Sequence, residues 1–301
     1  MPHVHIVHTT GYRYRNPVGL TRHRLMVRPQ DSHDLRLHEA TLTVEPAPTA
    51  TRWAHDVFGN SICFLEWDEA IRTQELKIVS TLDLTHFPAG PALPRATLDP
   101  AAEIFPFSYA ADEVPDLSRL TERQTPDPER SVDAWARQFV AGEGEVRTLA
   151  MLEAMTMAVK ANFTYGAREE EGTQTPAETL ALGTGTCRDF ALLMMEAARS
   201  LGLAARFVTG YLYDSTETDL KGGGATHAWC SIYLPGAGWV EFDPTNGLVA
   251  GANLIRVGVV RSPEQALPVA GGFIGDPADP LGLSVDVAVQ AAPDEATQQA
   301  A

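Results

Sequence analysis

The pattern of apolar and polar residues divides the chain into parts of different character. Over the first 87 residues, apolar and polar positions alternate in short runs such as HVHIVHTTGYRYR and LKIVSTLDL, with the period of strands that bury one face. The segment DVFGNSICFLEW predicts a hairpin that turns at Gly59-Asn60. Because this part shows no helical period, we expect residues 1–87 to form an antiparallel β-sandwich.

Two changes of pattern follow along the chain. Residues 88–130 hold eight prolines, which predict a connector laid over the surface rather than a core element. From residue 131 to residue 288, apolar residues first recur at helical spacing, as in VRTLAMLEAMTMAVKANF and CRDFALLMMEAARSLG, and then return to strand-like runs. Segregated helices and strands indicate an α+β domain. Residues 289–301 end in AAPDEATQQAA, which lacks bulky apolar side chains and predicts a disordered tail.

Charge and cysteine content narrow the classes of function. Lysine and arginine number 23 and aspartate and glutamate 39, so the formal charge is −16. Nucleic acid and an anionic membrane would repel such a chain, and we expect neither as the main partner. No signal peptide and no apolar run of membrane-spanning length is visible, and the three cysteines show no CxxC spacing. We therefore expect a cytoplasmic protein with free thiols and no structural zinc, while the oligomeric state stays open.

Cys187 is the first candidate for chemistry. It follows GTGT and opens the amphipathic segment CRDFALLMMEAARSLG, so we expect it at a helix N-terminus, with the helix running to about Leu201 and ending at Gly202. The helix dipole and the unpaired N–H groups there favour the thiolate, which is the nucleophilic form of cysteine. The alternative is a small residue that caps a buried helix, because free cysteine is often part of a core.

A thiol nucleophile needs a base, and His227 is the candidate. Eight of the nine histidines lie in the first 86 residues, which leaves His227 alone in the half that carries Cys187. In THAWCSIYL, strand alternation places His227 and Trp229 on one face and Cys230 on the other. Cys230 is therefore expected in the core, and so is Cys63, which lies between two apolar residues of an N-terminal strand.

Asp243 is the candidate for orienting the imidazole of His227. It stands 16 residues beyond His227, at the end of the strand-like GWVEFDP, with PGAG as the turn between the two strands. An antiparallel hairpin of this kind can place the carboxylate beside the imidazole. Glu241 lies on the same face and is the alternative orienter. A turn carboxylate before proline is also common without any catalytic role.

The motifs GTGTCRDFA, THAW and WVEFDPTNG resemble those of the transglutaminase-like superfamily of papain-related thiol enzymes. YRYRNPV, DVFGNSI and LKIVST resemble the N-terminal β-sandwich of its bacterial members, and NLIRVGVVRSPEQALPVAGGFIG resembles the segment that follows the DPTNG motif. The resemblance implies a papain-like core in which Cys187 is the nucleophile, His227 the general base and acid, and Asp243 the orienting group. Arg188 and Thr186 stand where the family often has glutamine and valine, which changes the charge and polarity of the expected pocket.

Further pocket residues follow from the same resemblance. The backbone N–H of Cys187 would be the first oxyanion donor, and Tyr165 resembles an aromatic residue that the family places before the cysteine helix. The Tyr165 hydroxyl would donate to an oxyanion, or the ring would only pack. Thr186 is a further pocket candidate, and Trp229 would line the entrance or pack on the strand face.

Together these features predict a thiol-dependent acyl transfer. Cys187 would attack an amide of a peptide or protein and form a thioester, which water would hydrolyse or an amine would convert to a new amide. We expect hydrolysis first, transamidation second, and no metal or organic cofactor. Two alternatives stay open: a binding or scaffolding module that keeps the fold without catalysis, and a zinc enzyme that uses His3, His5 and His8.

Overall fold

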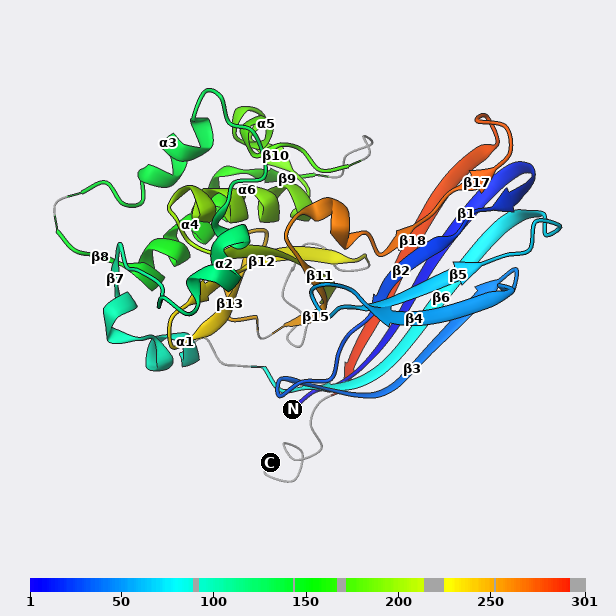
Figure 1. Ribbon diagram of the computed structural model, residues 1–301, viewed down its shortest axis with the longest axis horizontal. Helices are drawn as coiled ribbons and strands as arrows, with labels where there is room; N and C mark the ends of the chain where they lie inside the picture. Colours follow the sequence, from blue (N-terminus) through cyan, green and yellow to red (C-terminus); the bar gives the residue numbers. More distant parts are fainter. Residues whose placement is uncertain (89–91, 143, 167–171, 214–224, 252, 293–301) are drawn as a thin grey trace.

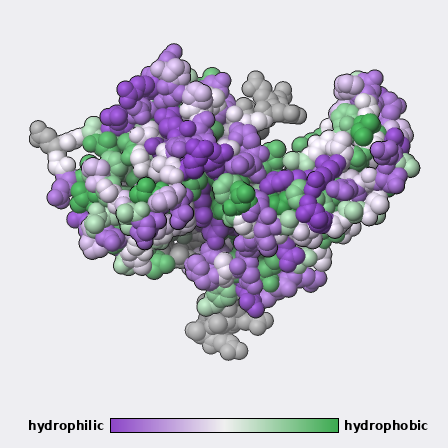
Figure 2. Space-filling view, in the orientation of Figure 1, coloured by the Kyte–Doolittle hydropathy of each residue, from purple (hydrophilic) through white to green (hydrophobic). Residues whose placement is uncertain are grey.

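Two halves lie side by side in the computed structural model (Figure 1). One half is built of long strands, and the other combines helices with a central sheet, so the architecture is α+β, as the sequence predicts. The molecular surface is indented between the two halves (Figure 2). Within the described part of the chain, no helix is long and apolar enough to cross a lipid bilayer. The described residues are 1–88, 92–142, 144–166, 172–213, 225–251 and 253–292.

The strand-rich half is a sandwich of two antiparallel sheets, which confirms the predicted fold of this half. In the first sheet the order is β17-β1-β6-β3, and β18 also pairs with β1. Its strands are β1 (His3–Leu20), β3 (Leu35–Glu45), β6 (Thr73–His86), β17 (Phe273–Ile274) and β18 (Pro280–Ala292). The second sheet, of order β16-β2-β5-β4, consists of β2 (His23–Arg28), β4 (Ala50–His55), β5 (Ser61–Glu66) and β16 (Val269–Ala270). Alternate side chains of both sheets meet in one apolar cluster that includes Leu25, Leu65, Leu76 and Ile78.

The predicted hairpin is formed by β4 and β5, which pair antiparallel around residues 56–60. The carboxylate of Asp56 accepts the backbone N–H groups of Phe58 and Asn60, each at 2.9 Å. Gly59 adopts a φ of 81°, a left-handed conformation that costs glycine little. Asn60 also donates its side-chain amide to the carbonyl of Val259 at 2.7 Å, so the turn ties the sandwich to the other half.

The C-terminal segment departs from the expected division of the chain. The sequence predicts that residues 131–288 belong to the core domain, but β16 pairs with β2, and both β17 and β18 pair with β1. Residues 289–292, expected in the tail, belong to β18, and residues 293–301 lie outside the described residues. The backbone groups along the outer edge of β1 need hydrogen-bond partners, and strands from the far end of the chain supply them.

The second half is built on a five-stranded antiparallel sheet of order β14-β13-β12-β11-β15. Its strands are β11 (Ala205–Leu212), β12 (His227–Leu234), β13 (Gly238–Asp243), β14 (Leu248–Val249) and β15 (Leu254–Val260). The helices around the sheet are α3 (Ser131–Arg137), α4 (Thr148–Asn162), α5 (Pro176–Leu182) and α6 (Cys187–Ser200), and the short η2 (Pro263–Ala266) follows β15. Two short parallel strands, β9 (Thr164–Tyr165) and β10 (Thr184–Gly185), lie beside the start of α6.

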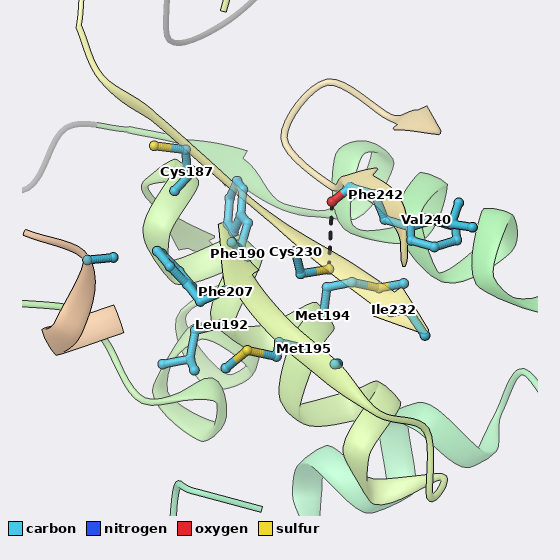
Figure 3. Close-up of a cluster of buried hydrophobic side chains, with 14 of the residues drawn as sticks. Cys187, Phe190, Leu192, Met194, Met195, Phe207, Cys230, Ile232, Val240 and Phe242 are labelled. Carbon is cyan, nitrogen blue, oxygen red and sulfur yellow. Dashed lines mark hydrogen bonds between the residues drawn. The ribbon is translucent and has the colours of Figure 1, made fainter. Parts of the chain in front are cut away.

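Helix α6 occupies the centre of this half and packs against β12. Twelve of its 14 residues are buried, and Figure 3 shows its apolar side chains among those of β11, β12 and β13. The helix begins at Cys187 and gives way to Gly202, whose φ of 84° ends it, as the sequence predicts. Cys230 lies within the apolar cluster, also as predicted, whereas Cys187 stands at its margin, at the end of the helix (Figure 3).

The proline-rich connector lies over the helices of the second half, and of its described residues only Pro94, Ala102 and Leu117 are buried. Its described part contains α1 (Leu93–Thr97), η1 (Pro100–Ala102), β7 (Ile104–Phe105), which pairs with β8 (Val146–Arg147), and α2 (Val114–Thr121). Glu196 of α6 is fully buried and accepts the Nε–H of Arg123 and the backbone N–H of Gln124, each at 3.0 Å. A buried carboxylate needs such donors, so the connector supplies hydrogen bonds to the carboxylate of Glu196, which it covers.

The two halves share one continuous apolar cluster. Two histidine–tyrosine hydrogen bonds cross the same boundary: His8 Nδ1 lies 3.0 Å from the Tyr211 hydroxyl, and His86 Nδ1 lies 2.9 Å from the Tyr213 hydroxyl. Desolvation by burial lowers the pKa of both histidines to about 4, so both imidazoles are neutral at pH 7.

Candidate active site

The backbone before α6 is shaped to present Cys187. Thr186 is the N-cap residue, and its backbone N–H and hydroxyl donate to Asp189 Oδ2 at 2.8 and 2.9 Å, which completes a capping box. A Cβ at Gly185 would lie 2.9 Å from the Asp189 side chain, so only glycine fits the approach to the helix. Cys187 follows as the first residue of α6 and is 8% exposed, enough to be reached from one side.

Asp189 is a buried residue that the sequence analysis did not single out. Besides capping the helix through Thr186, its Oδ1 accepts the backbone N–H of Gln174 at 2.7 Å. One carboxylate thus holds both the N-terminal turn of α6 and the segment before α5. The signal for this role was present in the spacing Thr186-x-x-Asp189, a pattern typical of a capping box.

The predicted hairpin brings His227 and Asp243 together. Strands β12 and β13 pair antiparallel with Cys230 opposite Phe242, which sets His227 near the end of β13. His227 Nε2 lies 2.8 Å from Asp243 Oδ2, and both side chains are fully buried. Because a buried ion pair is costly unless its geometry is good and its remaining atoms are hydrogen-bonded, the surroundings of the pair matter.

The turn after β13 supplies those hydrogen bonds. Asp243 Oδ1 accepts the backbone N–H of Thr245 at 3.0 Å, and Oδ2 also accepts the side-chain amide of Asn246 at 2.9 Å. The carbonyl of Asn246 accepts Lys160 Nζ at 2.8 Å, which ties the turn to α4. Burial raises the pKa of Asp243, but His227 and these donors outweigh burial and hold the pKa below its usual value.

The surroundings of His227 favour the protonated, positively charged form of its imidazole. Burial lowers its pKa, but the charge and hydrogen bond of Asp243 outweigh burial, and together with the Cys187 side chain they raise the pKa to about 10. Since Nε2 faces Asp243, Nδ1 is the nitrogen left for the thiol. Nδ1 is buried and makes no hydrogen bond within the usual limits of distance and angle among the described residues, a looseness common in unliganded thiol sites.

Tyr165 lies near Cys187, at the end of the short strand β9. Strands β9 and β10 pair in parallel with Tyr165 opposite Gly185, and the Tyr165 ring packs edge-on against Phe190 at 6.4 Å. Burial, the Cys187 thiol and the Asp243 carboxylate raise the pKa of Tyr165 to about 12, so its hydroxyl keeps its proton at neutral pH. A protonated hydroxyl beside the sulfur can donate a hydrogen bond, and the ring also packs.

Two other candidates lie away from the thiol. Trp229 is fully buried and stacks on His227 with a centroid distance of 6.0 Å, so it packs behind the imidazole and does not line the pocket. Glu241, the alternative orienter, bonds to Arg256 Nη1 at 3.1 Å and makes no hydrogen bond to His227. The carboxylate at the end of β13 therefore contacts the imidazole, while the one two residues earlier does not.

A pocket of about 190 Å³ opens onto Cys187 and His227. Arg188 contributes positive charge to its wall, but its guanidinium is engaged: Nη2 donates to the Pro263 carbonyl at 2.6 Å, and the group stacks over Phe207 at 5.1 Å. Burial lowers the pKa of Arg188 below its usual value. The remaining lining is small or polar, from Gly172, Thr186, Thr209, Thr226 and Ala228.

The N-terminal histidines do not gather around one point. His3 stacks on His38 with a centroid distance of 5.6 Å, His5 bonds to Asp83 at 2.9 Å, and His8 faces Tyr211. Among the residues that the structure describes, no three histidine, cysteine or acidic side chains are grouped so that they could hold a metal ion. His5 links two neighbouring strands of the sandwich, and His8 links the sandwich to the other half.

Known proteins share both halves of this architecture. The profile of the bacterial transglutaminase-like N-terminal region matches residues 4–84, and that of the transglutaminase-like superfamily core matches residues 133–244. An uncharacterized protein of Mycobacterium tuberculosis is 28% identical over 298 residues, covering 94% of this chain and 91% of the relative. One from Mycobacterium leprae is 25% identical over 287 residues, covering 94% and 97%. A candidate cysteine protease from Cytophaga hutchinsonii has the same fold, with a TM-score of 0.68 at 20% identity over 97% of this chain and 91% of that one.

Proposed function

Because the chain belongs to the transglutaminase-like superfamily, we propose that it is a thiol-dependent acyltransferase that acts on amides of peptides or proteins, chiefly as a hydrolase. One observation carries the proposal: a fully buried His227–Asp243 pair at 2.8 Å, whose second imidazole nitrogen is left for Cys187 at the start of α6. Burying a charged pair costs free energy, and a scaffolding module without catalysis has no use for such a pair.

The first half of the reaction forms a thioester. Cys187 gives its proton to His227 Nδ1, which leaves a thiolate beside a protonated imidazole, and the sulfur of this thiolate attacks the carbonyl carbon to form a C–S bond. The backbone N–H of Cys187 has no acceptor within the helix, because it belongs to the first turn, and it can donate to the oxyanion. His227 then gives its proton to the leaving nitrogen, the C–N bond breaks, and the amine departs.

The second half returns the thiol. His227 takes a proton from water, the hydroxide oxygen bonds to the carbonyl carbon, and the C–S bond breaks as the sulfur regains a proton. An amine in place of water would give transamidation. The walls of the pocket favour water, because threonine, glycine and an arginine guanidinium line it rather than bulky apolar side chains.

The proposal is tested with a peptide library prepared from a bacterial proteome. Mass spectrometry would count new peptide termini, glutamine deamidation and incorporation of an added labelled amine, which separates hydrolysis from transamidation. Cys187→Ala should abolish every one of these products, whereas the matched variant Cys230→Ala, whose thiol lies in the core, should keep them. Equal product patterns for the wild type and Cys187→Ala would overturn the proposal.

A further inference from the structure

The sandwich is open along one seam, between the edge strands of its two sheets. β3 ends the first sheet and β4 ends the second, and no described strand joins them. A groove of about 460 Å³ lies along this seam and is lined from both sheets. A second hollow of about 480 Å³ continues it toward Pro29 and Gln30, and the two share Arg28 and Trp53. The groove belongs to the N-terminal half, which the proposed chemistry does not use.

The groove combines an apolar floor with free strand edges. Leu65 and Leu82 are almost fully buried at its base, while Leu42 and Val44 of β3 are only partly covered. Each edge strand has one side that pairs with no described strand, where backbone N–H and C=O groups can pair with an added strand. An extended peptide would place alternate apolar side chains on the floor and its backbone against an edge.

Arg28 places a positive charge on the lining of the groove. Its guanidinium lies 5.6 Å from the ring of Trp53, which is 41% exposed. Within the described residues, Arg28 has no carboxylate within 4 Å, whereas Arg24 and Arg36 lie 3.7 and 3.3 Å from aspartates. A guanidinium held on an aromatic face at the mouth of a groove is suited to a carboxylate.

We propose that this seam is a binding groove for an extended segment of a partner protein, with alternating apolar side chains and a carboxylate opposite Arg28. A second copy of the chain fits less well, because both copies would carry a charge of −16. The last nine residues of the chain, PDEATQQAA, offer no bulky apolar side chain for the floor.

The test measures fluorescence anisotropy of a labelled peptide of alternating valine and threonine with one central glutamate, added to the full chain. Arg28→Gln should weaken binding about tenfold or more, the scale of a lost charge-assisted hydrogen bond. Arg52→Gln is the matched control: Arg52 precedes Trp53 on β4 but stacks on Phe64, outside the groove, so affinity should stay unchanged. Thermal unfolding of each variant establishes that it folds.

Two altered peptides test the groove without any change to the protein. Lysine in place of glutamate should weaken binding about tenfold, and proline in place of a threonine near the centre, with the glutamate kept, should weaken it because one ladder N–H is lost. The proposal is overturned if no peptide binds saturably, if the Arg28 and Arg52 variants behave alike, or if the lysine and glutamate peptides bind equally. It is also overturned if size-exclusion chromatography shows that Arg28→Gln breaks a dimer, because the occupant would then be a second copy.

Discussion

Replacing Asp243 by asparagine should slow the reaction of Cys187 while leaving the shape of the site intact. The carboxylate accepts His227 Nε2 and the Asn246 side-chain amide at Oδ2, and backbone N–H groups at Oδ1. Donors therefore face both oxygens. An amide has only one acceptor oxygen, so its NH₂ group must turn toward donors on one side or the other.

Either orientation harms the imidazole. If the NH₂ group faces His227, Nε2 must accept and the ring proton moves to Nδ1, which can then no longer take the proton of Cys187. If the carbonyl faces His227, the negative charge is lost and burial lowers the pKa of His227 from about 10. A hydrogen bond to a charged group contributes about 1.5–3 kcal/mol. At about 1.4 kcal/mol per factor of ten, alkylation of Cys187 at pH 7 should slow about 10- to 150-fold.

The assay is the rate of iodoacetamide alkylation at Cys187, followed by peptide mass spectrometry in the native protein. Glu241→Gln is the control, because Glu241 is on the same strand with its carboxylate bonded to Arg256 instead of His227. Its alkylation rate should match that of the wild type. If Asp243→Asn reacts as fast as the wild type, or if both variants slow equally, the orienting role of Asp243 is refuted.

Three further results are expected. Alkylation of the native protein should not modify Cys63 or Cys230, because both are fully buried. Burial also raises the pKa of both thiols, to about 11 for Cys63, so neither forms a thiolate at neutral pH. Labelling of either cysteine before unfolding would contradict their placement in the core. The free energy of unfolding, measured with urea, should fall as pH drops from 6.5 to 4, because folded His8 and His86 take up protons only near pH 4 while the unfolded chain takes them up near 6.5. The loss should be about 3 kcal/mol per histidine, and His8→Gln should remove about half of the combined loss, because His86 keeps its share. Gly210→Ala should lower that free energy by about 3 kcal/mol, because a Cβ there would overlap a backbone carbonyl oxygen of β15.

Gly202→Ala is the control for the Gly210→Ala prediction. Gly202 has a φ of 84° but open space around a Cβ, so alanine should cost only the left-handed conformation, about 1 kcal/mol. Equal losses for the two glycines would show that backbone conformation, rather than close packing, sets the cost at Gly210.

Local patterns were enough to predict the parts of the candidate site. The strand period of THAWCSIYL separates His227 from Cys230, and the turn before GWVEFDP brings Asp243 back beside the imidazole. Both inferences depend on residues within one hairpin, where spacing along the chain fixes spacing in the fold. The start of α6 at Cys187 follows from the same local reasoning.

Contacts between distant segments were beyond such reasoning. The strand-like run LSVDVAVQ predicts a strand near the C-terminus, but not that β18 (Pro280–Ala292) pairs with β1 at the other end of the chain. The prolines of residues 88–130 indicate where helices end. They do not predict that Arg123 of this connector donates a hydrogen bond to the buried Glu196 of α6. Asn246 was missed because its role depends on how the turn folds back onto Asp243.

In the proposed reaction Cys187 carries the acyl group, which intact-mass spectrometry would detect after the protein is mixed with an activated acyl ester. We expect one acyl adduct per chain, mapped to Cys187, that forms far more slowly in His227→Ala and is absent in Cys187→Ala. Adducts that appear on other residues, or that form at the same rate without His227, would contradict this role of Cys187.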